Sequence, residues 1–187
     1  MDRIDQLSTS RIDTTKEIPF KYRKSLFYGL AGDTVATALY ANGIRIFSRS
    51  LKYHRPRGLY SLDGECTNTF MQINGVPNEA TDTTLVREGM SVIPQNVLGS
   101  PEFDLLAGLD LFGWAMPAGF YYHVMHKPYT MWPFFKAFLR KMAGLGKIEP
   151  SFSMPGTYDE VYPQTDVCVV GGGPAGMNAA LAAASTG

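Results

Sequence analysis

The chain has 187 residues, 45% of them hydrophobic, and its 17 lysines and arginines balance 17 aspartates and glutamates. This length and apolar content are enough to bury a sizeable core, which predicts one or two globular domains. Because the formal net charge is zero, no overall field attracts nucleic acid or acidic lipid, and neither is expected as a partner. The two cysteines, Cys66 and Cys168, exclude a disulfide framework.

The cellular location is predicted from the N-terminus and from the apolar stretches. The first residues are charged and include no apolar segment of the kind found in signal peptides. The uncharged stretch after Asp166 is as long as a membrane span, but its glycines and Pro174 fit a turn better than a transmembrane helix. We therefore expect a soluble cytoplasmic protein that does not bind a membrane.

The first elements in chain order are two strands and a capped helix. Residues 1–17 lack hydrophobic periodicity and are expected to form a loose arm. Residues 18–22 and 25–30 predict strands joined by a short turn. Asp33 is a good N-cap for a helix over residues 34–41, and Asn42 and Gly43 provide its end.

Several short strands follow within the same domain. Residues 44–48 predict a strand, and Asn74 and Gly75 predict a two-residue hairpin turn between strands at 69–73 and 76 onward. Residues 83–86 and 91–94 predict further short strands. Hairpin, helix and strands together predict a small α+β domain of the β-grasp type over residues 18–98.

Between the helix and the hairpin lies a basic segment. Arg45, Arg49, Lys52, Arg55 and Arg57 are separated by no acidic residue. Two interpretations stay open: a solvated basic loop whose course is fixed by Pro56, or a clamp of arginines that binds phosphate or carboxylate at a domain or subunit boundary. Nucleic-acid binding would need a wider basic face and more stacking aromatics than Tyr53 alone.

A connecting region over residues 99–146 is rich in aromatic residues. Such side chains bury large areas and favour a packed connection between domains or subunits, with an amphipathic helix expected over residues 132–145. A helix lying on a membrane surface is disfavoured because Asp104, Asp110 and prolines interrupt the apolar face. His123 and His126 have the spacing of metal ligands, but no third ligand accompanies them. Residues 147–165, with several prolines, are expected to be a linker.

The last 22 residues, 166–187, contain a glycine-rich motif. An apolar strand over residues 167–170 is followed by Gly171, Gly173 and Gly176 in the G-x-G-x-x-G spacing, and then by a helix-forming stretch at 178–184. In a dinucleotide-binding fold, the first glycine forms the turn, the second admits the pyrophosphate, and the third lets the helix pack on the strand. The helix N-terminus also favours an anion. The alternative is an ordinary glycine turn between a strand and a helix.

We therefore predict a cofactor site at Gly171, Gly172, Gly173, Pro174, Ala175 and Gly176. The sequence Pro174-Ala175 within the motif is typical of flavoproteins with two dinucleotides. The acidic residue that would contact the ribose is expected about 20 positions further on, beyond Gly187, so NAD, NADP and FAD are not distinguished. One strand and one helix cannot form a sheet, so we expect the chain to be a fragment of a longer polypeptide.

Several segments together resemble one family. They are residues 32–43, the segment 48–58 containing Lys52-Tyr-His-Arg-Pro-Arg-Gly58, and residues 95–96, 101–104, 117–122 and 143–146, followed by the glycine turn. In order and spacing, residues 20–187 resemble the N-terminal part of the heterotetrameric sarcosine oxidase alpha subunit. The resemblance implies a β-grasp, ferredoxin-like domain, a connecting region, and the first β-α unit of a Rossmann-like dinucleotide-binding domain that continues past Gly187.

The resemblance also implies a function. The assembled enzyme would oxidise sarcosine to glycine at an FMN or FAD held by another subunit, giving hydrogen peroxide and formaldehyde or methylene-tetrahydrofolate. This chain would be a non-catalytic part of the alpha subunit, with beta, gamma and delta subunits as partners and tetrahydrofolate bound by a missing C-terminal domain. The alternatives are a subunit of a dye-linked dehydrogenase acting on proline, N-methylglutamate or an opine, and a non-enzymatic interaction module.

In related dehydrogenases the same domain carries a [2Fe–2S] cluster, which needs four thiolates, or two thiolates and two histidines. Here Cys66 is the one cysteine in the corresponding loop, while Thr69 and Thr81 stand where cluster-bearing relatives are expected to have cysteines. The loop shares only Gly64, Glu65 and Asn68 with the sarcosine oxidase pattern. Cys168 belongs to the predicted strand of the glycine motif. We therefore expect no iron–sulfur cluster in this chain.

Overall fold

A computed structural model describes residues 10–115, 118–119, 127–142, 150–151, 153 and 159–186. The chain divides into two units, Met1–Phe152 and Ser153–Gly187. Each unit is considered by itself.

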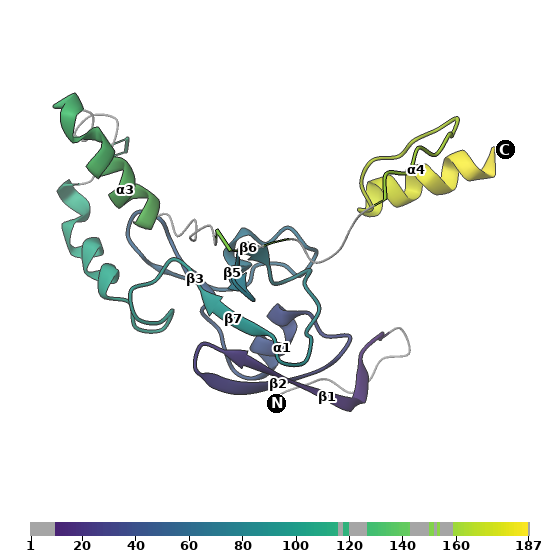
Figure 1. Cartoon of the computed structure of the whole chain (residues 1–187), viewed down its shortest axis with the longest axis horizontal. Helices are drawn as coiled ribbons and strands as arrows, with labels where there is room; N and C mark the ends of the chain where they lie inside the picture. The colour runs from purple at the N-terminus through teal and green to yellow at the C-terminus, as the bar shows by residue number, and fades with distance from the viewer. Residues whose placement is uncertain are drawn as a thin grey trace. The chain divides into compact units, whose positions relative to one another are not determined.

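The first unit is built on a mixed five-stranded sheet with the order β2-β1-β7-β5-β6 (Figure 1). The strands are β1 (Asp13–Tyr22), β2 (Ser25–Ala31), β5 (Phe70–Ile73), β6 (Val76–Ala80) and β7 (Ser91–Pro94). The pair β1–β7 is parallel, and the other neighbouring pairs are antiparallel. β1 begins at Asp13, earlier than predicted, because Asp13 and Glu17 pair with the end of β2 across a bulge.

The helix α1 (Val35–Ala41) lies where the sequence predicted it, but its N-cap differs. Thr34 is the N-cap, and its side-chain oxygen accepts a hydrogen bond from the Thr37 N–H. Asp33, the predicted cap, is buried, and its carboxylate instead accepts from the Leu30 N–H at 2.7 Å. Asp33 therefore closes the turn between β2 and the helix. The helix ends at Asn42, and Gly43 follows with a φ of +91°.

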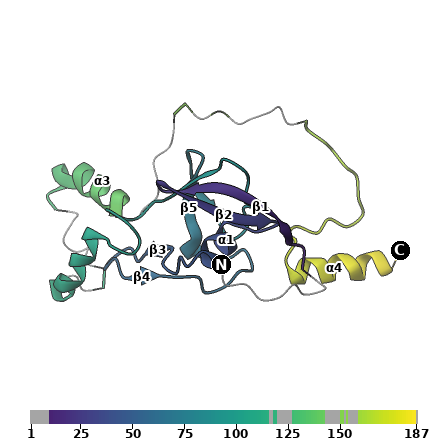
Figure 2. The ribbon, with the colours of Figure 1, turned by 90° about the horizontal axis from the view of Figure 1, so that it is seen from below.

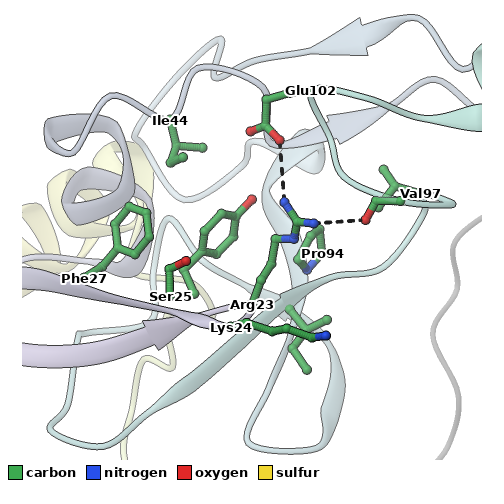
Figure 3. A pocket seen from close by; sticks show the side chains of 11 residues that line it. Arg23, Lys24, Ser25, Phe27, Ile44, Pro94, Val97 and Glu102 are labelled. Carbon is green, nitrogen blue, oxygen red and sulfur yellow. Dashed lines mark hydrogen bonds and ion pairs between the residues drawn. The ribbon is translucent and has the colours of Figure 1, made fainter.

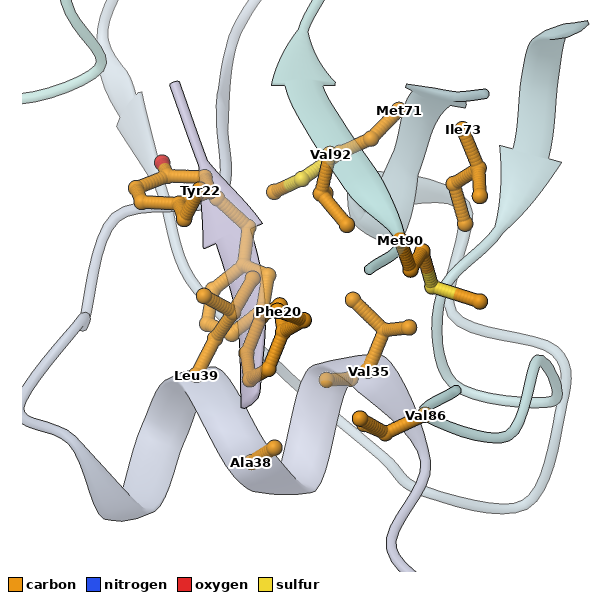
Figure 4. Close-up of a cluster of buried hydrophobic side chains, with 12 residues drawn as sticks. Phe20, Tyr22, Val35, Ala38, Leu39, Met71, Ile73, Val86, Met90 and Val92 are labelled. Carbon is orange, nitrogen blue, oxygen red and sulfur yellow. The ribbon is translucent and has the colours of Figure 1, made fainter. Parts of the chain in front are cut away.

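The hydrophobic core lies between α1 and the sheet (Figure 4). Val35, Ala38 and Leu39 come from the helix, and Phe20, Met71 and Val92 come from three different strands; all six are fully buried. Each large apolar side chain enclosed in this way stabilises the fold by roughly 1.5–3 kcal/mol. The core therefore fixes one helix against one face of the sheet, as expected for a ferredoxin-like domain.

The predicted hairpin is confirmed. Asn74 and Gly75 both have positive φ, 50° and 89°, as a type I′ turn between β5 and β6 requires. Two predicted strands of the first unit, at residues 83–86 and 44–48, are not formed as expected. Residues 83–86 make a single isolated bridge, between Leu85 and Thr34, because this loop crosses the start of α1 and buries Val86 in the core.

The predicted strand at 44–48 is replaced by a smaller ribbon. Only β3 (Ser48–Arg49) is a strand, and it pairs with β4 (Pro56–Arg57), which the sequence analysis did not predict. Ile44 packs against the core and Phe47 is buried within it. The position of residues 44–47 is therefore set by side-chain burial rather than by pairing as a strand. Figure 2 shows the β3–β4 ribbon to one side of the main sheet.

The connecting region contains the helices η2 (Leu105–Ala115), η3 (Tyr129–Met131) and α3 (Trp132–Met142), while the short helix η1 (Thr67–Thr69) precedes β5 in the first domain. The predicted helix at 132–145 is confirmed as far as Met142, and its remaining residues, like His123 and His126, lie outside the described residues. Several large side chains here are exposed, among them Phe103, Leu111, Trp114, Tyr129 and Phe134. No helix in the described residues is long and apolar enough to cross a membrane.

The second unit consists of an extended segment and the helix α4 (Pro174–Ser185). The helix confirms the predicted helical stretch and begins four residues earlier, at Pro174. The predicted strand at 167–170 does not form; Val167 is 59% exposed and Val170 is 94% exposed. A parallel strand needs neighbours to satisfy its N–H and C=O groups, and the described residues of this unit offer none.

Candidate functional site

The glycine turn forms a tight connection into α4. Gly171 has a φ of +110°, in the region that favours glycine. A Cβ on Gly176 would lie 2.0 Å from the Gly171 carbonyl oxygen, so no other residue fits there. Nothing lies within 4 Å of a Cβ built on Gly172 or Gly173. The turn is therefore closed on one side, between Gly171 and Gly176, and open on the other.

The start of α4 presents unpaired donors at the same place. Gly173 is the N-cap and makes no side-chain cap, and its carbonyl accepts from the Met177 N–H at 2.9 Å. Pro174 has no N–H, and the N–H groups of Ala175 and Gly176 have no carbonyl four residues back within the helix. The structure thus gathers the six predicted site residues into one loop and the first turn of one helix.

The basic segment is not a single cluster of free charges. The Arg49 guanidinium is buried and donates to three carbonyl oxygens, those of Pro101 (2.7 Å), His54 (2.8 Å) and Glu102 (3.0 Å). The Arg45 guanidinium lies over the Tyr40 ring and donates to the Tyr40 carbonyl. Both arginines therefore bind backbone carbonyls, Arg49 in the interior and Arg45 at the exposed surface.

Two further cations of the basic segment, Lys52 and Arg55, also contact other side chains. Arg55 donates to Asp110 of η2 at 2.8 and 3.1 Å, and this carboxylate raises the pKa of Arg55. Lys52 and Arg55 lie 4.8 and 4.7 Å from the centre of the Tyr53 ring. The Arg57 guanidinium differs, because in the described part of the chain no carboxylate or carbonyl accepts a hydrogen bond from it.

Arg57 lines a polar pocket of about 520 Å³. One wall is formed by residues 48–51. The other walls are formed by Thr67, Asn68 and Phe70, by Asn78 of β6, and by Gln95 and Asn96, which follow β7. Hydroxyl and amide side chains dominate the lining: Ser48, Ser50, Thr67, Asn68, Asn78, Gln95 and Asn96.

A second pocket, of about 720 Å³, lies at the turn between β1 and β2 (Figure 3). There the Arg23 guanidinium faces the Glu102 carboxylate at 3.9 Å. The Tyr22 hydroxyl is buried and has no hydrogen-bond partner among the described residues. Burial raises the pKa of Tyr22, and the nearby Glu102 carboxylate raises it further against the opposing effect of Arg23.

A buried hydrogen-bonded pair that the sequence analysis missed connects the basic segment to the residue just before η2. His54 and Asp104 have fully buried side chains, with Nδ1 and Oδ2 2.7 Å apart. The other carboxylate oxygen of Asp104 accepts from the N–H groups of Leu98 (2.9 Å) and Leu106 (3.1 Å). Both residues lie in segments that carried the family resemblance, but the sequence contains no sign that they meet.

The loop that contains Cys66 is held together by a network of hydrogen bonds. The Cys66 N–H donates to Asp82 Oδ2 at 3.1 Å, and the Thr69 hydroxyl lies 2.7 Å from the Cys66 carbonyl and 2.9 Å from Asp82 Oδ1. The Thr81 hydroxyl donates to the Thr69 carbonyl at 2.7 Å. Both threonines are thus used to close the loop around one buried thiol.

Residues 17–97 match a family described as the 2Fe-2S iron-sulfur cluster binding domain. This match contradicts our expectation that the chain has no iron–sulfur cluster, because the matched family is described as cluster-binding. The side chains around Cys66 do not form the four-ligand set of such a cluster, and the described residues contain no group of three or more His, Cys, Asp or Glu able to hold a metal. No chemical step is therefore assigned to a cluster.

Comparison with curated proteins identifies three similar alpha subunits of sarcosine oxidase. The one from Rhizobium meliloti (strain 1021) is 33% identical over 181 residues, which is 94% of this chain and 18% of that protein. Those from Corynebacterium sp. strains U-96 and P-1 are 28% and 30% identical, over 97% and 98% of this chain and 15% of each relative. The chain therefore spans less than a fifth of the length of these relatives.

Among solved structures, L-proline dehydrogenase from P. horikoshii is similar at a TM-score of 0.36 and 22% identity, covering 46% of this chain and 16% of that one. This similarity is too weak to bear on function. The resemblance found in the sequence is confirmed: residues 17–97 match the 2Fe-2S iron-sulfur cluster binding domain family, and most of the chain is similar to sarcosine oxidase alpha subunits at 28–33% identity.

Proposed function

We propose that this chain supplies scaffold and the beginning of a dinucleotide-binding domain to a multi-subunit flavoprotein sarcosine oxidase. The observation that carries the proposal is the geometry of residues 171–176. Gly171 at a φ of +110° and the 2.0 Å approach at Gly176 restrict both positions to glycine, while the N–H groups at the start of α4 remain available to an anion. Homologues named as sarcosine oxidase subunits support the same class of enzyme.

The site would bind the pyrophosphate of the dinucleotide. The N–H groups of Ala175 and Gly176 would donate to its oxygens, and the positive end of the α4 dipole would stabilise its charge. Gly172 and Gly173 leave the space that a close-lying phosphate needs. The segment 167–170 would pair into a parallel sheet once its neighbouring strands are present, as in a Rossmann-like fold.

The reaction of the intact enzyme would be the oxidation of the N-methyl C–N bond of sarcosine. Sarcosine, water and O₂ would give glycine, formaldehyde and hydrogen peroxide, with two electrons passing through a flavin held by another subunit. Tetrahydrofolate bound elsewhere in the protein would accept the one-carbon unit when present. In this proposal the described residues of the chain position the nucleotide and the subunits, and the chemistry is supplied by the flavin.

The test uses the intact protein that contains this chain, purified with its partner subunits. Binding of NAD⁺ and of FAD is measured by calorimetry, and sarcosine-dependent consumption of O₂ is measured alongside. Dinucleotide binding together with sarcosine turnover is the expected result. Turnover of proline, N-methylglutamate or an opine without turnover of sarcosine would contradict the assignment of sarcosine as the substrate. An intact protein that binds neither dinucleotide would reject the site.

A further inference from the structure

We propose that the polar pocket around Arg57 is a binding site for a small organic oxyanion, a phosphate ester or a carboxylate. The pocket is separate from the glycine turn, since it is lined by residues 48–96 of the first unit. Its volume of about 520 Å³ is in the range of small-molecule sites. A site of this size has room for an organic body attached to the anion.

The electrostatics of the pocket favour an anion. Arg49 and Arg57 both line it, and its lining among the described residues includes no aspartate or glutamate. The pocket around Tyr22 provides an internal comparison, because there the Glu102 carboxylate faces Arg23 at 3.9 Å and offsets its charge. Arg57 has no such acid beside it, so its planar pair of N–H donors is available to two oxygens of a ligand.

The wall that carries Arg57 is held in place by buried polar contacts. Asn96 binds the Arg49 backbone with both amide atoms: its Oδ1 accepts from the Arg49 N–H at 3.2 Å, and its Nδ2 donates to the Arg49 carbonyl. The Arg49 guanidinium, 9% exposed, is fixed on three carbonyl oxygens. A free solvent loop has no need of this bracing, whereas a binding site gains affinity from being preorganised.

The other wall supplies groups for the rest of the ligand. Thr67 and Asn68 precede the Phe70 ring, which is 42% exposed, and Leu51, 53% exposed, lies on the ribbon side. The Asn68 amide donates to the Gly58 carbonyl at 2.8 Å, which ties this wall to the end of the basic segment. A hydroxyl, an amide and two apolar surfaces suit a sugar or planar body attached to the oxyanion.

The test measures binding of inorganic phosphate, AMP and malonate to the intact protein by calorimetry, at low and high salt. Wild type is expected to bind AMP or malonate more tightly than phosphate, and the tighter of the two identifies the class of oxyanion. Arg57→Gln should weaken that binding by roughly 10- to 100-fold, as for the loss of a charge-assisted hydrogen bond. Arg57→Lys keeps the charge but not the planar donors, so its affinity for the anion should lie between those of wild type and Arg57→Gln.

The matched control is Arg23→Gln, which removes the guanidinium of the other pocket and should leave the affinity unchanged. Binding that is equal in wild type and Arg57→Gln would overturn the proposal, as would an intact protein that binds none of the three anions at about 10 mM, near the weak limit of specific sites. Gly176→Val, which blocks the glycine turn, should still bind the anion. A result in which Gly176→Val alone loses it would place the anion at the dinucleotide site.

Discussion

His54 Nδ1 and Asp104 Oδ2 form a hydrogen bond of 2.7 Å between two fully buried side chains fifty residues apart in the sequence. Removing one member of a buried hydrogen-bonded pair leaves the other unsatisfied, at a cost of about 1–3 kcal/mol. Asp104→Ala also removes the acceptor for the Leu98 and Leu106 N–H groups. We expect it to lower the free energy of unfolding by about that amount in urea titrations of the intact protein.

The exposed pair of Arg55 and Asp110 provides the control. Asp110→Ala should change the free energy of unfolding by less than about 1 kcal/mol, because solvent screens exposed ion pairs. Equal effects of the two substitutions would contradict the assigned role of the buried pair.

Gly176→Val should abolish dinucleotide binding at the glycine turn. The new side chain would begin 2.0 Å from the Gly171 carbonyl oxygen, so the turn must open and move the donors of α4. Calorimetry of the intact protein should show at least about a 100-fold loss of dinucleotide affinity, equivalent to roughly 2.7 kcal/mol. Gly108→Ala, in η2 where nothing lies within 4 Å, is the control and should bind normally. If Gly176→Val bound the dinucleotide with unchanged affinity, the glycine turn would not be the dinucleotide-binding site.

Gly75→Ala tests the hairpin between β5 and β6. A Cβ at this position meets nothing within 4 Å, so the cost comes from the backbone φ of +89° alone. We expect a loss of stability of about 1–2 kcal/mol, the cost of placing a residue with a Cβ in the left-handed region. Thermal unfolding measures it against Gly108→Ala, whose backbone φ is outside that region. A Gly75→Ala protein as stable as wild type would mean that the turn adopts another conformation.

Tyr22 should make stability depend on pH in the alkaline range. Burial raises its pKa in the folded protein above that of the unfolded chain, so folding favours the protonated phenol. Its contribution is complete below the unfolded pKa of about 10 and is lost as pH rises toward the folded pKa. Tyr22→Phe should therefore reduce the alkaline loss of stability, as followed by urea unfolding at increasing pH. An identical pH profile would contradict this account.

At neutral pH the same substitution should have little effect. The Tyr22 hydroxyl has no hydrogen-bond partner within the described residues, so its removal breaks no bond. A loss above about 1 kcal/mol in Tyr22→Phe would indicate that an ordered water or another group satisfies this hydroxyl.

Local patterns predicted the elements whose causes are local. Asn74 and Gly75 specify their turn by backbone preference alone, and the helix over 35–41 follows from its cap and its apolar spacing. The prediction of Asp33 as the cap was wrong, because its carboxylate accepts from the Leu30 N–H in the turn after β2 and Thr34 is the N-cap instead. Neighbouring candidates of similar propensity are separated only by contacts outside the helix.

Elements that depend on distant partners were predicted less well. Residues 44–47 have strand-like composition but form no strand in the described structure; Phe47 is buried in the core, and its N–H donates to the Arg57 carbonyl of β4 at 2.8 Å. A local demand for glycine exists at two positions of the motif, Gly171 through its positive φ and Gly176 through its close approach to the Gly171 carbonyl. The contact of His54 with Asp104 could not be predicted, since nothing in either segment indicates the other. The same holds for the pocket around Arg57, whose walls come from residues 48–57, 67–78 and 95–96.

The position of β7 between β1 and β5 affects how the domain is made on the ribosome. Before Ser91–Pro94 is synthesised, the β1–β2 and β5–β6 pairs are two separate hairpins, each marginal in water by itself. The nascent chain must keep both hairpins and the apolar face of α1 unassembled until this four-residue strand leaves the exit tunnel. A stall during translation before that point would leave an aggregation-prone intermediate, and the last strand of the sheet to be made is the one that joins its two halves.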